Sequence, residues 1–82
     1  ESACLGWTGA RVTLHAGLDI ATRVTGSIEP GDTILSAHIG RSGQDGRVWS
    51  YYTVFEQSGS HPPIVSGWTT EDLFQTCEQF AG

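Results

Sequence analysis

The chain has two cysteines, Cys4 and Cys77, and nearly all of its 82 residues lie between them. Neither cysteine belongs to a CxxC pair or stands beside a histidine, so their spacing does not indicate a zinc site. We interpret them as one disulfide that ties the ends of the domain together. In the chain-entropy treatment, closing so long a loop contributes about 4 kcal/mol of stability, a large share of the total for a small domain. The alternative is two free buried thiols in a cytosolic protein.

Length and charge limit the classes of function that this chain can have. Residues 1–82 form one domain, and a domain of this size buries too little surface to build a two-substrate cleft with its own cofactor. We therefore expect neither enzymatic activity nor a cofactor. Four arginines and no lysine stand against nine acidic residues, for a net charge of −5, which disfavours nucleic acid and anionic lipid as partners. No apolar run approaches the ~20 residues of a membrane span.

The compartment is indicated by the two cysteines and by the first residue. The sequence starts at Glu1 and not at a methionine, which we expect if a secretion signal has been removed or if the domain has been cut from a longer chain. Together with a disulfide, this predicts a secreted, extracellular protein.

Alternating apolar and polar residues predict an all-β fold, a small barrel or sandwich of about five short antiparallel strands. The clearest strands are residues 11–15, 33–39, 47–55 and 64–69, and residues 16–28 are interpreted as a long excursion between strands. Residues 29–32 (Glu-Pro-Gly-Asp) predict a type II turn, and Asp45 followed by Gly46 predicts a hairpin connection. A single helical turn is expected over residues 70–74, with Thr70 as its N-cap.

The strand at residues 47–55 carries large side chains on both of its faces. One face is expected to fill the core while the other has a separate role, and a bulge near Ser50 could exchange parts of the two sets. The pattern alone does not decide which face is buried. The two sets are Val48, Tyr52 and Val54 on one face and Trp49, Tyr51 and Phe55 on the other.

The order of these signals resembles that of the bacterial-type SH3 (SH3b) domains. The resemblance rests on Leu-His-Ala-Gly at residues 14–17, Val-Thr-Gly-Ser-Ile at 24–28, Pro-Gly-Asp-Thr-Ile at 30–34, the Tyr-rich strand with Trp49, and Gly67-Trp68 followed by Leu73. It spans residues 11–74. Two features depart from the family: His15 stands where the family often has arginine, and the loop at residues 56–63 is long.

The resemblance implies an SH3-like barrel and a non-catalytic module that holds an attached muramidase or other hydrolase on peptidoglycan. In that family an extended stem or cross-bridge peptide lies in a shallow groove between the loop after the first strand and the aromatic strand. Transferred by position, the groove walls are Trp7, Trp49, Tyr51 and Trp68, and the polar contacts are Asp19, His38 and Arg47. A net charge of −5 suits a ligand with free amino groups.

Other functions are weighed against this one. A free-standing secreted inhibitor or effector could use the same barrel to bind a protein partner, through His61-Pro62-Pro63 for example. A eukaryotic-style SH3 domain that binds proline-rich peptides is less favoured, because its characteristic opening motif and acidic loop are missing.

Metal binding and catalysis have little support in the sequence. His15, His38 and His61 have no ligand spacing, and no local signature of a catalytic triad accompanies them. Glu71 and Asp72 are interpreted as charges at the start of a helical turn rather than as a catalytic pair.

Overall fold

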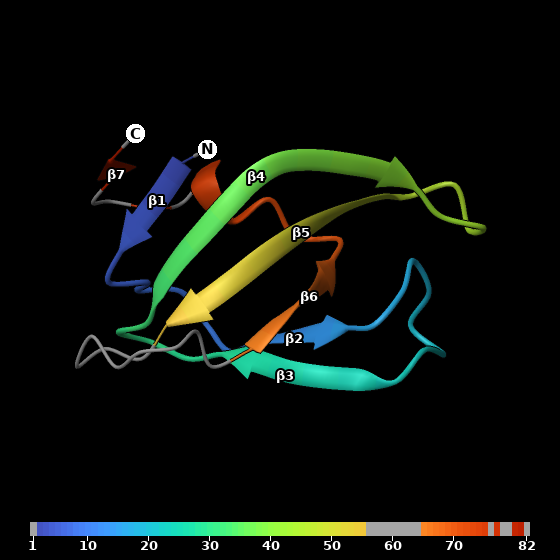
Figure 1. Ribbon diagram of the computed structural model, residues 1–82, viewed down its shortest axis with the longest axis horizontal. Coiled ribbons are helices and arrows are strands. Elements are labelled where there is room, and N and C mark those ends of the chain that lie inside the picture. Colours follow the sequence, from blue (N-terminus) through green and yellow to red (C-terminus); the bar gives the residue numbers. More distant parts are fainter. Residues whose placement is uncertain (1, 56–64, 76, 78–79, 82) are drawn as a thin grey trace.

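The computed structural model of the protein describes residues 2–55, 65–75, 77 and 80–81. They form an all-β fold in which seven antiparallel strands make one sheet, in the order β3-β2-β6-β5-β4-β1-β7 (Figure 1). The strands are β1 (Ser2–Leu5), β2 (Val12–His15), β3 (Val24–Ile28), β4 (Thr33–Ser42), β5 (Val48–Phe55), β6 (Val65–Thr69) and β7 (Phe80–Ala81).

The sheet departs from the predicted barrel of about five strands, because it has seven strands and is not closed. Strands β3 and β7 are its two edges, because β1 pairs with β4 and β7 pairs with β1, on the side of the sheet away from β3. The additional strands lack a readable signal. β1 and β7 are too short to alternate, and Gly26 interrupts the pattern of β3, so residues 24–28 form a strand where the sequence predicts part of an excursion.

The hydrophobic core lies against one face of the sheet. Tyr52 and Val54 of β5 point into it, which settles which set of that strand fills the core, although Val48 of the same set is 60% exposed. Val48 lies at the outer end of the strand, beyond the core. The buried core residues are Cys4, Trp7, Leu14, Ile28, Ile34, Tyr52, Val54 and Leu73.

An irregularity in β4 bends the sheet. Ser36 pairs with Tyr52 and Gly40 pairs with Ser50, so residues 37–39 stand opposite the single residue Tyr51. Extra residues in one strand of a pair bend that strand and increase its twist. The irregularity falls in β4 rather than near Ser50 in β5, and it coincides with the arch of β4 in Figure 1.

Two turns have the conformations that the sequence predicts. Gly31 has a φ of 96° and the Asp32 N–H donates to the Glu29 carbonyl at 3.1 Å, as in a type II turn. Gly46 has a φ of 81°, and its N–H donates to the Gly43 carbonyl at 3.1 Å. The two turns connect β3 to β4 and β4 to β5.

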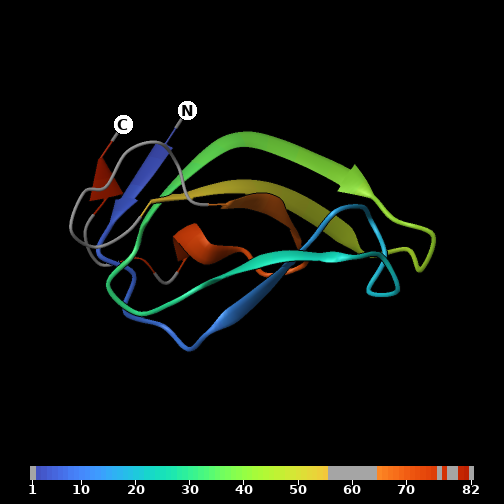
Figure 2. The same ribbon diagram turned by 60° about the horizontal axis from the view of Figure 1, so that its bottom comes forward.

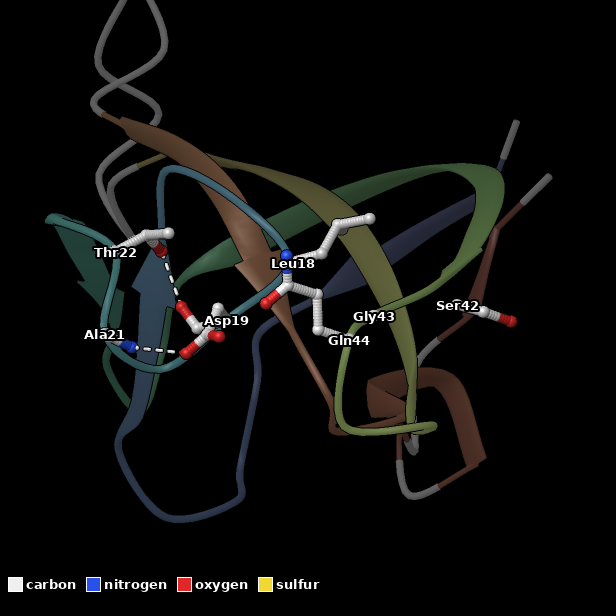
Figure 3. A pocket seen from close by; sticks show the side chains of 7 residues that line it. All are labelled: Leu18, Asp19, Ala21, Thr22, Ser42, Gly43 and Gln44. Carbon is white, nitrogen blue, oxygen red and sulfur yellow. Dashed lines mark hydrogen bonds between the residues drawn. The ribbon is translucent and has the colours of Figure 1, made fainter.

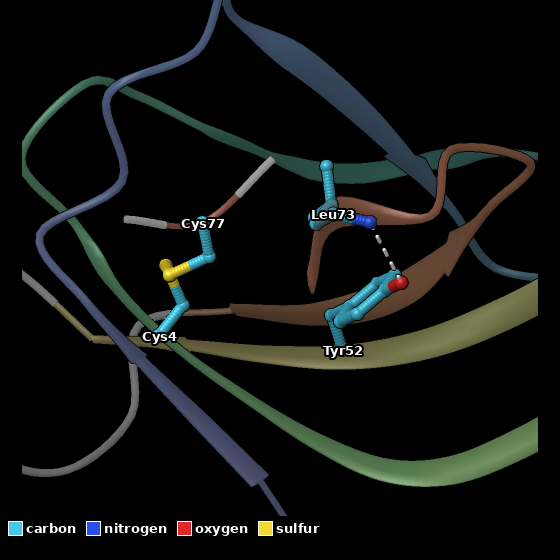
Figure 4. The surroundings of a disulfide bond; sticks show 4 residues. All are labelled: Cys4, Tyr52, Leu73 and Cys77. Atoms are coloured by element: carbon cyan, nitrogen blue, oxygen red, sulfur yellow. Dashed lines mark hydrogen bonds between the residues drawn. A yellow bond between two sulfur atoms is a disulfide. The ribbon is translucent and has the colours of Figure 1, made fainter. Parts of the chain in front are cut away.

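The segment after β6 does not form the helical turn predicted over residues 70–74. It has instead a three-residue 3-10 segment, η1 (Leu73–Gln75). The Tyr52 hydroxyl donates to the Glu71 carbonyl at 3.1 Å and accepts from the Leu73 N–H at 3.2 Å. The Glu71 carbonyl, which an α-helical turn would bond within its own backbone, is thus bound by a side chain of β5. Figure 4 shows the second bond of the same hydroxyl, to the Leu73 N–H.

The predicted disulfide is present. Cys4 in β1 is bonded to Cys77, with their Cα atoms 6.0 Å apart, and Cys4 is fully buried. The bond lies close to Tyr52 and Leu73 in the core (Figure 4).

The molecule has two distinct ends along its 35 Å axis. β1 and β7 lie at one end, and the β2–β3 loop (residues 16–23) and the β4–β5 turn (residues 43–47) lie together at the other (Figures 1 and 2). The disulfide therefore fastens the end opposite to these two loops.

Candidate functional site

Aromatic side chains form a row across the sheet on the face opposite to the core. Tyr51 of β5 stands directly opposite Trp68 of β6, and Trp68 stands opposite His15 of β2. The Tyr51 and Trp68 rings meet edge to face, with centroids 5.1 Å apart. All three side chains are half-buried, so the row keeps exposed aromatic surface. Aromatic pairs in this geometry are held by ring quadrupoles as well as by burial.

Trp49 extends this row toward the loop end. It lies two residues before Tyr51 and so projects from the same face of β5. Its ring meets the His15 ring edge to face at 5.9 Å, and the Arg47 guanidinium lies 5.9 Å from its centroid. Unlike its neighbours, Trp49 is only 1% exposed. We call His15, Trp49, Tyr51 and Trp68 the aromatic face.

A hollow of about 470 Å³ lies beside Trp49, between the β2–β3 loop and the β4–β5 turn. Figure 3 shows the side chains that surround it. One residue that lines it, Gly43, packs directly against Trp49 and the facing loop. A Cβ atom at Gly43 would lie 2.6 Å from the indole Nε1 and 2.6 Å from the Leu18 carbonyl oxygen. We call this space between the two loops the loop hollow. It is lined by Leu18, Asp19, Ala21, Thr22, Ser42, Gly43 and Gln44.

The β2–β3 loop is held by its own hydrogen bonds. The Asp19 carboxylate accepts the Ala21 N–H at 2.8 Å, and the Asp19 carbonyl accepts the Thr22 hydroxyl at 2.6 Å (Figure 3). The Thr22 hydroxyl also accepts the Gly17 N–H, and the Thr22 carbonyl lies 3.2 Å from Nδ1 of His15. Asx-type bonding of this kind gives a loop a defined shape. This wall of the loop hollow is therefore preformed and tied to the aromatic face through His15.

The β4–β5 turn forms the opposite wall and carries a charge pair. The Asp45 carboxylate accepts the Arg47 N–H at 3.0 Å and the Arg47 Nε–H at 2.6 Å. These bonds, the backbone one first and the side-chain one second, lower the pKa of Asp45 below its ordinary 3.8. Asp45 is thus ionised at neutral pH and holds the Arg47 guanidinium near the Trp49 ring.

The structure brings together five of the seven residues suggested by sequence. Trp49, Tyr51 and Trp68 share the aromatic face, with Asp19 and Arg47 at its loop end. Trp7 lies in the core, where its indole N–H donates to the Ala10 carbonyl at 3.1 Å. The side chain of His38 lies outside the part that the structure describes, as does His61.

Other lining residues were not anticipated from the sequence. His15 was considered only as a metal ligand and as a departure from a family pattern, yet it joins the β2–β3 loop to Trp49. Gly43 packs directly on the indole. In the sequence, the one indication of this role is that Gly43 belongs to a glycine-rich connection between two strands.

A second hollow, of about 330 Å³, lies beside Trp7 between residues 9–12 and the segment that holds Glu71 and Asp72. The indole N–H in its wall is already bonded within the chain, and Arg11 pairs with Glu29 at 3.1 Å. Over the described residues, no three histidine, cysteine or acidic side chains gather to hold a metal ion. Nor does that part of the chain contain a helix long and apolar enough to cross a membrane.

Residues 1–82 match a family described as a domain of unknown function, DUF4453. The chain belongs to this family. No curated protein and no solved structure matches it. For this DUF4453 chain, the function has to be argued from the aromatic face and the loop hollow.

Proposed function

We propose that the protein is a non-catalytic, SH3b-like module that binds the peptide part of peptidoglycan and so holds an attached lysozyme- or muramidase-type hydrolase on bacterial walls. The observation that carries the proposal is the aromatic face, which displays Tyr51 and Trp68 on the side of the sheet that the core leaves free. The resemblance of the sequence to SH3b domains supplies the class of ligand.

A shallow aromatic surface suits an extended peptide with small side chains. Such a ligand offers little side-chain area, so its binder gains affinity from flat rings pressed against the chain and from hydrogen bonds to the ligand backbone. Tyr51 and Trp68 offer the rings. The loop hollow, at the Trp49 end of the same face, is lined by Asp19 and Gln44, whose side chains carry polar groups.

The net charge of the chain and the positions of its terminal strands support binding of a cell-wall peptide by a domain that is attached to a hydrolase. The chain carries a net charge of −5, which attracts the free amino groups of unlinked stem peptides. β1 and β7 lie at the end opposite to the β2–β3 loop and the β4–β5 turn (Figure 2), whose residues line the loop hollow, so a neighbouring domain joined at β1 or β7 would not cover the hollow. The disulfide suits the oxidising environment of a secreted protein.

The test is a pull-down on insoluble peptidoglycan, with chitin and cellulose as control polymers. The wild-type chain is expected to bind peptidoglycan alone, and Trp68→Ala is expected to weaken binding roughly 10-fold because it removes a stacking surface. Leu5→Ala is the matched control, since Leu5 is an exposed apolar residue of β1 at the far end. Circular dichroism checks that both variants fold.

Two results would count against the proposal. If the wild type binds none of the polymers, the wall-binding function is wrong, and a protein partner becomes the better hypothesis. If Trp68→Ala binds as tightly as the wild type, the aromatic face is not the binding surface.

A further inference from the structure

The few positive charges of this acidic chain are unevenly distributed. The sequence has four arginines and no lysine, and two of the arginines, Arg41 and Arg47, flank Trp49 at the loop end of the aromatic face. Residues 40–50 contain two arginines and one aspartate, so this end of the β4–β5 hairpin is net positive although the whole chain has a net charge of −5. A local charge opposite in sign to that of the chain attracts an oppositely charged group of a ligand.

The pairing of β4 with β5 brings the two arginines together. Arg41 is the direct cross-strand partner of Trp49, so both side chains project from the same face of the sheet. Arg47 directly precedes β5, and its guanidinium lies 5.9 Å from the centroid of the Trp49 ring. The Arg47 carbonyl accepts the Gly43 N–H at 2.8 Å, and Gly43 comes two residues after Arg41. The two arginines are therefore diagonal neighbours across the hairpin, a separation that long side chains span.

Most of the hydrogen-bonding capacity of these two side chains is unused by the chain. Within the described residues, Arg41 is exposed and makes neither an ion pair nor a side-chain hydrogen bond. Arg47 bonds to Asp45 through its backbone N–H and its Nε–H, and in the same part of the chain its two terminal amino groups make no further bond. The Arg47 guanidinium is thus held in place by Asp45 and by the Trp49 ring, with its side chain 53% exposed.

An anion would remove the repulsion between the two arginines. Asp45 is bonded to Arg47 and compensates one positive charge, which leaves that of Arg41 uncompensated. Asp19 on the facing loop accepts the Ala21 N–H with its carboxylate, and it pairs with neither arginine. A carboxylate suits this place because a guanidinium presents parallel N–H donors that match its two oxygens.

We propose that Arg41 and Arg47 bind a carboxylate of the peptide ligand at the loop end of the aromatic face. This inference rests on the proposed function for the identity of the ligand, and it names the group that is recognised, the free carboxylate at the end of an unlinked stem peptide. It also sets the direction of the bound peptide. Its carboxyl end lies toward the β4–β5 turn, while the preceding residues pack against Tyr51 and Trp68.

The deciding experiment compares two forms of one peptide, acetyl-lysyl-D-alanyl-D-alanine with a free terminal carboxylate and the same peptide as its terminal amide. We expect the wild type to bind the acid about 3- to 10-fold more tightly than the amide, as for an exposed charge-assisted contact. Arg41→Gln should reduce this preference to less than about 2-fold and leave the Kd of the amide unchanged. A variant that is merely less well folded would weaken binding of both peptides alike.

Arg11→Gln is the matched control. It removes the same charge from an exposed arginine that pairs with Glu29 beside the second hollow, away from the aromatic face. This variant should keep the preference of the wild type for the acid. Melting temperatures of both variants check that they fold.

A second measurement separates this inference from the function on which it rests. The arginine Nε–H signals are followed by NMR while acetyl-D-alanyl-D-alanine is added, and in a parallel titration while its terminal amide is added. The acid is expected to move the signals of Arg41 and Arg47 and to leave that of Arg11 in place. The amide should move none of the three.

Each outcome has a defined meaning. If the wild type binds the acid and the amide equally, recognition of a carboxylate is wrong although binding of the peptide stands. If Arg41→Gln keeps the full preference for the acid, the assignment of Arg41 is wrong. If the wild type fails to bind peptidoglycan in the pull-down but the acid alone moves the Arg41 and Arg47 signals, the wall-binding function fails and the carboxylate site stands. An acid that moves neither signal overturns the carboxylate site.

Discussion

The Tyr52 side chain joins the core to the segment that follows β6. Its ring is 2% exposed in the core, and its hydroxyl bonds to the backbone at Glu71 and Leu73. The ring also packs against Phe74, with centroids 5.9 Å apart. One phenol thus fixes the segment that leads from β6 to the disulfide.

The stability of the protein is expected to fall as the pH rises above about 10, because of this phenol. Burial raises the pKa of Tyr52 above its ordinary 10.0. The unfolded chain therefore ionises at a lower pH than the folded one, and the stabilisation present below pH 10 is lost as the pH passes upward through the folded pKa. Tyr52→Phe should lower the free energy of unfolding by about 1–2 kcal/mol at pH 7, since it removes the hydroxyl and its hydrogen bonds. The same variant should lose less stability than the wild type as the pH rises above about 10. Urea unfolding at pH 7 to 11 measures both effects.

Tyr51→Phe is the matched control for Tyr52→Phe. It alters a half-buried phenol on the other face of the same strand, and it should keep the alkaline fall because Tyr52 is intact. If the free energy of unfolding of Tyr52→Phe falls above about pH 10 as steeply as that of the wild type, another group is responsible for the pH dependence.

At the scale of elements, the β4–β5 turn matters because its main chain packs directly on an indole. Gly43 has no room for a side chain, since a Cβ would lie 2.6 Å from Nε1 of Trp49 and 2.6 Å from a backbone oxygen of the facing loop. The contact therefore sets how closely the two walls of the loop hollow approach.

Gly43→Ala is expected to push the turn away from Trp49. Because part of the clash is with backbone, we expect a loss of about 1–3 kcal/mol in the free energy of unfolding, and a red shift of tryptophan emission as Trp49 meets solvent. Gly40→Ala is the control, because its Cβ would meet only the Val48 side chain at 3.5 Å, an ordinary contact. Unchanged emission and stability in Gly43→Ala would show that the turn does not seal the indole.

Strands with strong local patterns were predictable from sequence, and strands made by long-range pairing were not. The prediction for residues 47–55 matches β5 closely, because β-branched and aromatic residues fill it. β1 and β7 gave no signal, since each is short and owes its place to pairing with distant residues. The same holds for η1, where the hydroxyl of Tyr52, far away in the sequence, decides the local hydrogen bonding.

The candidate site was predictable to a similar degree. Alternation along β5 placed Trp49 and Tyr51 on one face, as found. Trp7 could not be separated from the groove tryptophans by sequence, because its burial depends on backbone bonds to the β3–β4 turn, from the Trp7 N–H to Asp32 and from the Gly31 N–H to Trp7. The burial of Trp49 likewise depends on two loops folding over it.

At the scale of the whole molecule, the disulfide and the loop hollow lie at opposite ends. The Cys4–Cys77 bond holds β1 and the C-terminal segment together. β1 and β7 lie at one end of the molecule, and the β2–β3 loop and the β4–β5 turn, whose residues line the loop hollow, lie at the other (Figure 1). A small open sheet has a limited core, so a cross-link between its terminal segments stabilises the fold without restricting the loops.

Reduction of this disulfide is expected to cost about 4 kcal/mol of the free energy of unfolding, because it frees a loop of 73 residues in the unfolded state. That loss is comparable with the total stability of many small domains, so the reduced protein should be marginally folded. Urea unfolding of the oxidised and the reduced wild type measures the difference with both sulfur atoms in place. The double variant Cys4→Ala with Cys77→Ala adds a cavity at fully buried Cys4, so it should be less stable than the reduced wild type. If reduction lowers the stability by less than about 1 kcal/mol, the sheet and its core hold the terminal strands without the cross-link, and the chain-entropy account is wrong for this fold.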